Sequence, residues 1–436
     1  MGGVRSWMAL VAALALLVGC APDDDAPDAP SADPEAEEEM PREPFGDRIL
    51  VIDHDKGGPL GDGLQEMFEL AQEELGIQIE VTQFADTTAY QQSIQSSLPT
   101  DSPPDLVTWW SGYRMEDLVA SGELVSLNDQ WDDYIANDYL SGDLADAFRF
   151  DGEIYGVPLH VSYWPVFYNV EMFDELGLDV PETWDELIQV ADTLVDNDIT
   201  PFFATTDGRW PAFIWFEEFI IRTDPDFYAR LVEGDESYDD PLVIDAMEEW
   251  GEWIERGYFT PLDTDMNDHP AMMAEGEVAM SVQGTWFNSA YQGAGLEPGD
   301  GYDTFILPNR DPGLGENVII FETSPLALTA NANNRDEALE FLDWWVEPDT
   351  QAALASRIGD TPASPAVPAP DAAMQSLVDR IDEGDYRSLQ RYWEASPPAI
   401  VEAAVDELSR FMLNPDQASE VATSIEGIAQ MEWGAR

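Results

Sequence analysis

The spacing of apolar side chains changes several times along the first part of the chain, and each change predicts a new element. Residues 49–53 form an apolar run of strand composition, and residues 77–84 alternate apolar and polar positions as a strand does. Between them, the apolar residues of 61–75 recur at helical spacing, and 106–109 is another apolar strand. Strands that alternate with helices predict an α/β sheet with parallel strand pairs.

Helical periodicity dominates the later part of the chain. Thr183 followed by Glu186 is a capping-box pattern, which predicts a helix that runs to residue 196. The proline-rich stretch 362–370 interrupts the periodicity and predicts a break between structural units. Further helices are predicted at 245–256, 335–346, 398–413 and 416–431.

The first twenty residues carry a pattern of their own. Arg5 precedes an apolar run over residues 7–18, which ends just before Gly19 and Cys20. A run of this length suits a signal peptide and is shorter than the roughly 20 residues that span a bilayer. A small residue before a lone cysteine is typical of lipoprotein signal peptides, so we expect cleavage after residue 19 and lipidation of Cys20. The alternative is a buried free cysteine in a secreted chain that is cleaved elsewhere.

Residues 20–45 consist almost entirely of Ala, Pro, Asp and Glu. Such a segment has too little apolar surface to offset its ordering entropy, so we expect a disordered acidic tether. The rest of the 436-residue chain is too long for one core, and we expect it to form two or three lobes. Because Cys20 is the single cysteine, no intramolecular disulfide and no cysteine metal site can form.

The net charge of −71 is extreme, and Lys56 is the single lysine. Acid excess with lysine depletion is typical of proteins that work in molar salt, where a Debye length of roughly 3 Å screens the repulsion. We therefore predict a halophile's protein. The same charge argues against nucleic acid and anionic ligands as partners. A calcium-binding acidic protein is the alternative, but the acids are dispersed and no D-x-[DN]-x-[DN]-G loop is present.

The sequence contains no recognisable catalytic or cofactor motif. His54, His160 and His269 are scattered, and none has a neighbour at metal-ligand spacing. Motifs for zinc proteases, serine hydrolases, phosphate loops and dinucleotide binding are absent. With 89 acidic residues, any carboxylate pair drawn as a glycosidase dyad is uninformative. We therefore expect no catalytic residue, metal or cofactor.

Aromatic residues beside Gly, Pro and Asp offer a different chemistry. Their flat faces suit the C–H faces of sugar rings, and neighbouring polar groups can bind the hydroxyls. The competing interpretation is that each tryptophan fills the core, and we prefer it for Trp184, Trp250, Trp253, Trp344 and Trp345, which lie inside predicted helices. The aromatics at segment ends are Trp109, Trp110, Tyr113, Tyr163, Trp164, Trp210 and Trp286.

Five stretches occur in an order that resembles the extracellular solute-binding proteins of bacterial ABC importers, in particular the sugar-binding group typified by maltose-binding protein. The most specific one covers 152–188 and reads G-x-x-Y-G-V-P, then Y-N, then F-x-x-x-G-L, then P-x-T-W-x-E-L. The others lie at 55–58, 104–127, 273–286 and 333–351. Together they span most of residues 48–430.

The resemblance implies an α/β fold, namely a two-lobed periplasmic-binding-protein-like clamshell with several interlobe crossings. It places crossings near 157–161, near 319–324 and near 377–383. The expected organisation is therefore a signal peptide at 1–19, a tether at 20–45, lobe 1 at 46–158 and 323–378, and lobe 2 at 159–322 and 379–436.

The resemblance also implies ligand-binding residues. Asp55 and Lys56 match a loop that binds sugar hydroxyls, Trp286 matches a tryptophan that stacks on a sugar ring, and Trp210 lies in a loop region of the site. Trp109 and, with a one-residue shift, Arg114 match nearby positions. No aromatic stands at 399–400, where the family has one, and the neighbouring Tyr392 and Trp393 are the expected substitutes. The candidate ligand-binding set is Asp55, Lys56, Trp109, Trp110, Tyr113, Arg114, Tyr163, Trp164, Trp210, Trp286 and Trp393.

Sequence and resemblance together predict a receptor rather than an enzyme. We expect a monomeric extracytoplasmic protein, periplasmic or at the cell surface, that is anchored to the cell membrane by lipid at Cys20. It would capture a sugar or oligosaccharide and deliver it to the transmembrane subunits of an ABC permease. The alternatives are a polyamine or polyol receptor of the same fold, an exported carbohydrate-active hydrolase, and a cell-surface adhesin.

Overall fold

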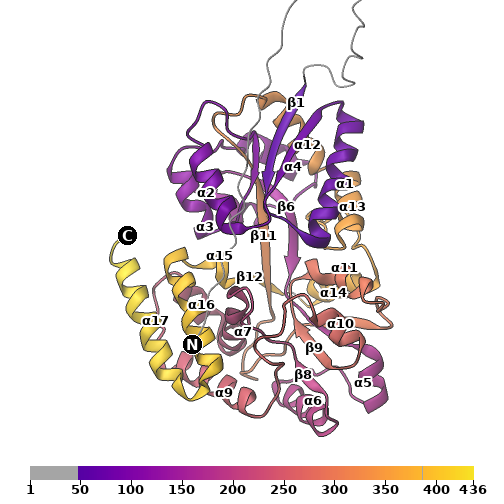
Figure 1. Ribbon diagram of the computed structural model, residues 1–436, viewed down its shortest axis with the longest axis vertical. Helices are drawn as coiled ribbons and strands as arrows, with labels where there is room; N and C mark the ends of the chain where they lie inside the picture. Colours follow the sequence, from indigo (N-terminus) through magenta and orange to yellow (C-terminus); the bar gives the residue numbers. More distant parts are fainter. Residues whose placement is uncertain (1–47, 385) are drawn as a thin grey trace, which may run out of the picture. The chain divides into compact units, whose positions relative to one another are not determined.

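The computed structural model describes residues 48–384 and 386–436. The predicted signal peptide, Cys20 and the tether at 20–45 lie outside the described residues. The described residues belong to one compact unit, which contains a six-stranded sheet, a four-stranded sheet, a two-stranded hairpin and the helices that cover them. Figure 1 shows these as an upper and a lower group of elements joined by long strands.

The first sheet contains the strands that the sequence predicts at its start. β1 (Ile49–His54) pairs in parallel with β2 (Gln78–Gln83) and with β3 (Leu106–Thr108), which confirms the parallel pairs. β11 (Val318–Leu328) continues the sheet antiparallel to β3. Helices of the first lobe cover this sheet, and they are α1 (Gly58–Leu75), α2 (Thr87–Ser97), α3 (Tyr113–Ala120), α4 (Asn128–Ala136), α12 (Arg335–Trp345) and α13 (Pro348–Ile358).

The second sheet is mixed and has the order β10-β7-β9-β8. Its strands are β7 (Val166–Asn169), β8 (Thr200–Phe202), β9 (Val278–Val282) and β10 (Tyr302–Phe305), and only β8 and β9 run in parallel. The helices of this lobe are α5 (Val170–Leu176), α6 (Trp184–Asp196), α7 (Ile214–Thr223), α8 (Pro225–Val232), α9 (Pro241–Glu255), α10 (His269–Ala274), α11 (Asn288–Gly293), α14 (Ala372–Glu383), α15 (Tyr392–Ala395), α16 (Pro398–Leu413) and α17 (Ala418–Trp433). A small hairpin of β4 (Arg149–Phe150) and β5 (Glu153–Ile154) is separate from both larger sheets.

Local signals in the sequence reappear in the structure. Helix α6 begins with the complete capping box, since Thr183 accepts a hydrogen bond from the Glu186 N–H and Glu186 caps the Thr183 N–H. The helical tryptophans are core residues, as predicted. The side chains of Trp184, Trp250, Trp253, Trp344 and Trp345 are all buried.

Two antiparallel strands carry the chain between the lobes. β6 (Val157–Tyr163) pairs with β11 along most of its length, with an irregularity between Ser324 and Pro325 (Figure 1). Asp360, fully buried beside this pair, accepts hydrogen bonds from Ser162 and from Thr285 Oγ1 (2.5 Å). The carboxylate thus connects a crossing strand to the turn that precedes Trp286.

The last crossing lies earlier than the expected boundary at residue 378. Met374 of α14 packs in a cluster with Phe167 and Tyr291 of the second lobe, so the chain has already entered that lobe. The transition therefore falls within the proline-rich stretch 362–370. β12 (Arg387–Gln390) then joins the first half of β11 in parallel.

His269 gives the second lobe a pH-dependent stability. Its ring is fully buried and stacks on Phe203, and burial lowers its pKa from 6.5 to about 3. Below pH 6.5 the unfolded chain therefore binds a proton that the folded chain does not, so stability falls as the pH falls. We expect His269→Phe to reduce the stability loss between pH 6.5 and 5 by about 2 kcal/mol. Denaturant unfolding at both pH values checks this, and an unchanged difference would contradict it.

Candidate functional site

A hollow of about 470 Å³ lies between the lobes, beside the crossing strands. The first lobe contributes the loop after β1 and the start of α2, and the second lobe contributes residues around 208–210 and Trp286. Its lining includes Asp55, Lys56, Thr87, Gln91, Trp110, His160, Arg209, Trp210, Trp286, Glu322, Ser324, Arg391, Trp393 and Glu402. Six of the candidate residues are thus brought together here, and they are Asp55, Lys56, Trp110, Trp210, Trp286 and Trp393.

Four half-buried tryptophans form the apolar part of the lining. Trp286 lies with its ring centroid 6.4 Å from that of Trp210. Trp393 stacks on Phe213 at 6.0 Å, and Trp110 contacts the buried Trp109 edge-on at 5.2 Å. Each ring therefore contacts another aromatic and keeps part of its surface exposed.

The charges of the hollow are paired with one another. Lys56 Nζ lies 3.4 Å from Asp55 Oδ1, and Arg391 Nη2 lies 2.6 Å from Glu322 Oε2. The third pair joins Arg209 Nη1 to Glu402 Oε2 at 3.4 Å. Three cations therefore balance three carboxylates, so this hollow is close to neutral in a chain of net charge −71.

The loop after β1 offers groups that can bind hydroxyls. Asp55 Oδ1 is buried and accepts no hydrogen bond from the described residues, and Lys56 Nζ lies 5.5 Å from the centroid of Trp110. The Lys56 N–H donates to His54 Nδ1 at 3.2 Å, which needs an unprotonated ring nitrogen. Burial and the nearby Lys56 lower the pKa of His54 to about 4, so the ring is neutral at pH 7 and the loop stays in place.

Trp286 is fixed by a network of buried charges. Its Nε1–H donates to Glu322 Oε1 at 2.6 Å, and the other Glu322 oxygen pairs with Arg391. Arg391 also contacts Glu394, which is fully buried. Burial opposes the charge of Arg391, but Glu322 and Glu394 together keep its pKa above the ordinary value. Arg391 therefore stays charged and holds Glu322 in position to orient the Trp286 ring.

The structure places the five other candidate residues outside this lining. Trp109 is 4% exposed and donates from Nε1 to the Arg114 carbonyl at 2.7 Å, so it belongs to the core. Trp164 is 1% exposed, and Tyr163 packs against the hydrophobic clusters of the first lobe. Tyr113 instead lies edge-on to Trp433 at 5.8 Å.

Arg114 is a structural residue at the junction of the lobes. Its guanidinium lies 3.7 Å from the centroid of Trp393, and Nη2 pairs with Glu402 at 2.9 Å. Nε also donates to the Trp393 carbonyl at 3.0 Å. Arg114 therefore lies behind the hollow, with its Nε and Nη2 donors engaged by residues of the second lobe.

Gly112 permits the close contact of α3 with the second lobe. Its φ is +59°, and a Cβ there would lie 2.3 Å from the Glu394 carbonyl oxygen. We expect Gly112→Ala to cost about 3 kcal/mol of unfolding free energy. The control Gly122→Ala, at φ +75° but with no heavy atom within 4 Å of its Cβ, should cost about 1 kcal/mol. Thermal unfolding compares them, and equal losses would contradict the proposed clash.

Glu322, Arg391 and His160 line the hollow but were not among the candidate residues predicted from the sequence. Glu322 and His160 each interrupt an apolar strand that crosses between the lobes, and a polar residue in a buried strand is a signal that could have been used. Arg391 carries no such signal, because its partner Glu322 lies 69 positions away in the sequence, although Glu394 lies only three positions away. Its role depends on the tertiary arrangement.

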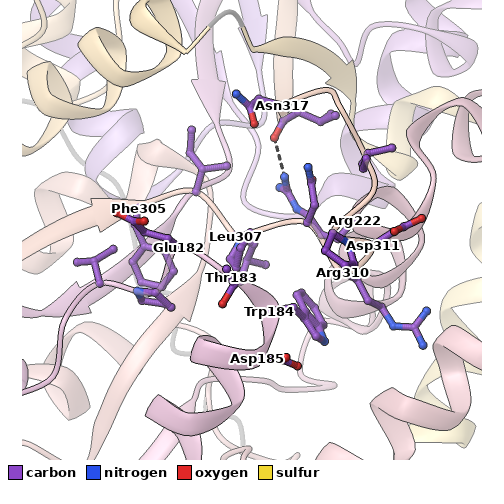
Figure 2. A pocket seen from close by; sticks show the side chains of 18 of the residues that line it. Glu182, Thr183, Trp184, Asp185, Arg222, Phe305, Leu307, Arg310, Asp311 and Asn317 are labelled. Atoms are coloured by element: carbon purple, nitrogen blue, oxygen red, sulfur yellow. Dashed lines mark hydrogen bonds between the residues drawn. The ribbon is translucent and has the colours of Figure 1, made fainter.

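A larger hollow, of about 780 Å³, lies within the second lobe (Figure 2). It is bordered by the start of α6, by residues 305–318 and by Arg222, which donates to the Val318 carbonyl at 2.6 Å. Its aromatics Trp184 and Phe305 are 6% and 1% exposed, and only Tyr386 among its lining aromatics is half-buried. This hollow therefore offers less exposed aromatic surface than the interlobe one, which has four half-buried tryptophans.

Residues 48–384 and 386–436 contain no group of three or more His, Cys, Asp or Glu side chains that could hold a metal ion. In those two ranges, no helix combines the length and the apolar character needed to cross a membrane.

Comparison with known proteins gives matches to solute-binding proteins. The family model described as "Bacterial extracellular solute-binding protein" matches residues 57–352. An uncharacterized ABC transporter extracellular-binding protein of Pyrococcus horikoshii is 25% identical over 336 residues, which cover 76% of this chain and 73% of that protein. The alpha-glucosides-binding periplasmic protein AglE of Rhizobium meliloti is 27% identical over 206 residues, or 43% of this chain and 45% of AglE.

Solved structures share the fold. The bacterial solute receptor AcbH, described with a preference for β-D-galactopyranose, superposes with a TM-score of 0.79 at 22% identity. The match covers 89% of this chain and 100% of AcbH. The two-lobed α/β architecture predicted from the sequence is therefore confirmed.

Proposed function

Because this chain belongs to the bacterial extracellular solute-binding protein family, we propose that it is the receptor of an ABC importer and binds a neutral sugar in the interlobe hollow. The proposal of a neutral sugar as the ligand rests on one observation. In a chain of charge −71, the hollow combines four half-buried tryptophans with a charge-balanced lining. Aromatic faces with a few placed polar groups suit an uncharged ligand that carries many hydroxyls.

The polyamine alternative is disfavoured by the same arrangement. A polycation would need carboxylates without cationic partners, but each carboxylate of the lining lies within 4 Å of an arginine or lysine. Several relatives are named for sugars, including AglE and the glucose-binding protein GlcS of Saccharolobus solfataricus. These names support the sugar class, and they do not choose among sugars.

We also propose how the receptor is held at the membrane and how it delivers its ligand. The family is extracellular, and lipidation of Cys20 would hold the receptor at the membrane through the 20–45 tether. The paired strands β6 and β11 would act as the hinge on which the lobes close around the sugar. The closed monomer would then deliver its sugar to the permease without chemical change, as a receptor and not as an enzyme.

Lys56 is expected to bind a ligand hydroxyl directly. Replacing it with Met removes three charged donors from the hollow, and hydrogen bonds to charged groups contribute roughly 1.5–3 kcal/mol. We expect Lys56→Met to weaken sugar binding about tenfold or more. The matched control Arg335→Met removes a positive charge from an exposed helix position and should leave affinity unchanged. If the wild type, Lys56→Met and Arg335→Met bound the sugar with equal affinity, the proposed role of Lys56 would be contradicted.

A panel titration tests the proposed function. Four tryptophans line the hollow, so intrinsic fluorescence should report occupancy. The panel would contain glucose, galactose, maltose, trehalose, sucrose, raffinose, glucosylglycerol and spermidine, in about 2–3 M KCl to screen the charge. We expect saturable binding of at least one sugar and no product after long incubation. Product release would support the hydrolase alternative, and binding of spermidine alone would support the polyamine alternative.

A further inference from the structure

His160 lines the interlobe hollow from β6, the strand that crosses between the lobes. The residue is 4% exposed, and its Nδ1 lies 3.0 Å from Ser162 Oγ and 3.3 Å from Asp360 Oδ2. The other ring nitrogen, Nε2, has no hydrogen-bond partner among the described residues, yet it retains accessible surface. One ring nitrogen is therefore held by the protein, and the other is open to a ligand in the hollow.

The hydrogen bonds of Asp360 determine which ring nitrogen of His160 carries the proton. One oxygen of this fully buried carboxylate accepts from the Thr361 N–H at 2.8 Å and from the Thr285 hydroxyl at 2.5 Å. The other oxygen accepts from the Ser162 hydroxyl. Because a carboxylate only accepts, the single hydroxyl proton of Ser162 is used for Asp360. Ser162 Oγ can then only accept from His160, so Nδ1 carries the hydrogen, and Nε2 of the neutral ring keeps a lone pair.

We infer that Asp360 is a positioning residue that presents His160 Nε2 as a hydrogen-bond acceptor, and that His160 selects a ligand hydroxyl that donates to it. The inference rests on the proposed function and adds a specificity-determining residue to the same site. The cations of the lining, Lys56, Arg209 and Arg391, can only donate hydrogen bonds. A neutral imidazole acceptor complements them without adding charge to a lining whose charges are already paired.

Asp360 also connects His160 to the tryptophan proposed to stack on the sugar. Thr285 directly precedes Trp286, and its Oγ1 accepts the Tyr163 N–H at 3.1 Å while its hydroxyl donates to Asp360. The same carboxylate therefore holds the acceptor on β6 and the turn that carries Trp286 in the second lobe. A sugar stacked on Trp286 would thus meet the lone pair of His160 in a fixed position.

NMR correlation spectra of the histidine rings test the position of the proton without any ligand. The chain has three histidines, and the signal that disappears in His160→Phe belongs to His160. In the full-length protein at about pH 8, we expect a protonated Nδ1 and an unprotonated Nε2. Asp360→Asn places an N–H donor beside Nδ1, because the Thr361 N–H needs the oxygen that remains, so the proton should move to Nε2. The control Ser162→Ala keeps the contact of Nδ1 with Asp360 and should leave the proton on Nδ1.

Fluorinated sugars test the acceptor role. Glucose and galactose would be compared by calorimetry in KCl with analogues in which each hydroxyl in turn is replaced by hydrogen or by fluorine. Fluorine cannot donate, so at the position that faces His160 we expect the fluoro analogue to bind about tenfold or more weakly than the parent sugar, and no more tightly than the deoxy analogue. His160→Phe and Asp360→Asn should both lose this difference. The control His269→Phe removes a histidine outside the lining and should keep it.

Three results would overturn the inference and leave the proposed function standing. They are a protonated Nε2 in the wild type, a proton that stays on Nδ1 in Asp360→Asn, and an undiminished difference between parent and fluoro analogue in His160→Phe. Failure of both glucose and galactose to bind would also overturn the inference. It would overturn the proposed function only if the remaining sugars of the panel failed to bind as well.

Discussion

Replacing Trp286 with Ala is expected to weaken sugar binding roughly 100-fold, because truncation of a central, well-supported tryptophan typically costs about 2–4 kcal/mol. The Trp286 ring is half-buried in the interlobe hollow, and its Nε1–H is bonded to Glu322 at 2.6 Å. The substitution removes the stacking surface and also leaves Glu322 without its neutral donor. Calorimetric titration with the sugar selected by the panel measures the loss.

Two variants separate stacking from structural damage. Trp344→Ala removes a tryptophan whose Nε1–H donates to Glu74 at 2.7 Å, a matching bond in the first lobe outside the interlobe lining. It should leave affinity unchanged while the protein stays folded. Trp286→Phe keeps an aromatic face but loses the N–H, so we expect an intermediate affinity. If Trp286→Ala bound the sugar as tightly as the wild type, the stacking role would be excluded.

Transfer from concentrated to dilute salt is expected to lower the melting temperature by about 6 °C, because roughly 5 kcal/mol of repulsion acts against an unfolding entropy of about 2.1 cal/mol/K per residue. The chain carries 89 acidic and 18 basic residues, so most carboxylates have no cation to pair with. In molar salt the Debye length is about 3 Å, compared with about 10 Å at 0.1 M, so salt screens this repulsion. Far-UV circular dichroism at about 0.1, 1 and 3 M KCl measures the melting temperature.

A neutral osmolyte distinguishes charge screening from general stabilisation. Sucrose also favours compact states, through exclusion from the protein surface, but it does not screen charge. We therefore expect sucrose in dilute buffer to recover only a small part of the lost stability. A melting temperature that stayed constant or fell as KCl was added would contradict the prediction of a protein adapted to salt.

Local patterns were sufficient to predict much of the fold. The periodicity over 61–75 and the capping box at Thr183 involve residues within one or two helical turns, so tertiary contacts were not needed to read them. The parallel arrangement of β1, β2 and β3 followed from the alternation of strands with helices. The boundary between lobes near 362–370 was placed later in the chain, because α14 has the same periodicity in either lobe.

Long-range contacts explain what the sequence could not predict about the site. Trp109 and Trp110 are adjacent and chemically identical, yet Trp109 is buried in the core and Trp110 lines the hollow. Which of the two tryptophans is buried depends on the direction that the backbone takes after β3. The contacts of Trp286 with Glu322, and of Glu322 with Arg391, join three distant segments. Such a network exists only once both crossing strands and β12 are in place.

The most direct test of the account compares a neutral sugar with charged analogues of the same ring. Calorimetry in about 2–3 M KCl, where long-range charge effects are screened, would measure the strongest sugar of the panel, its amino-sugar and uronic-acid forms, and spermidine. The charge-balanced lining predicts micromolar or tighter binding of the neutral sugar and at least about tenfold weaker binding of each charged form. Binding of a charged form or of spermidine in preference to every neutral sugar would contradict the account.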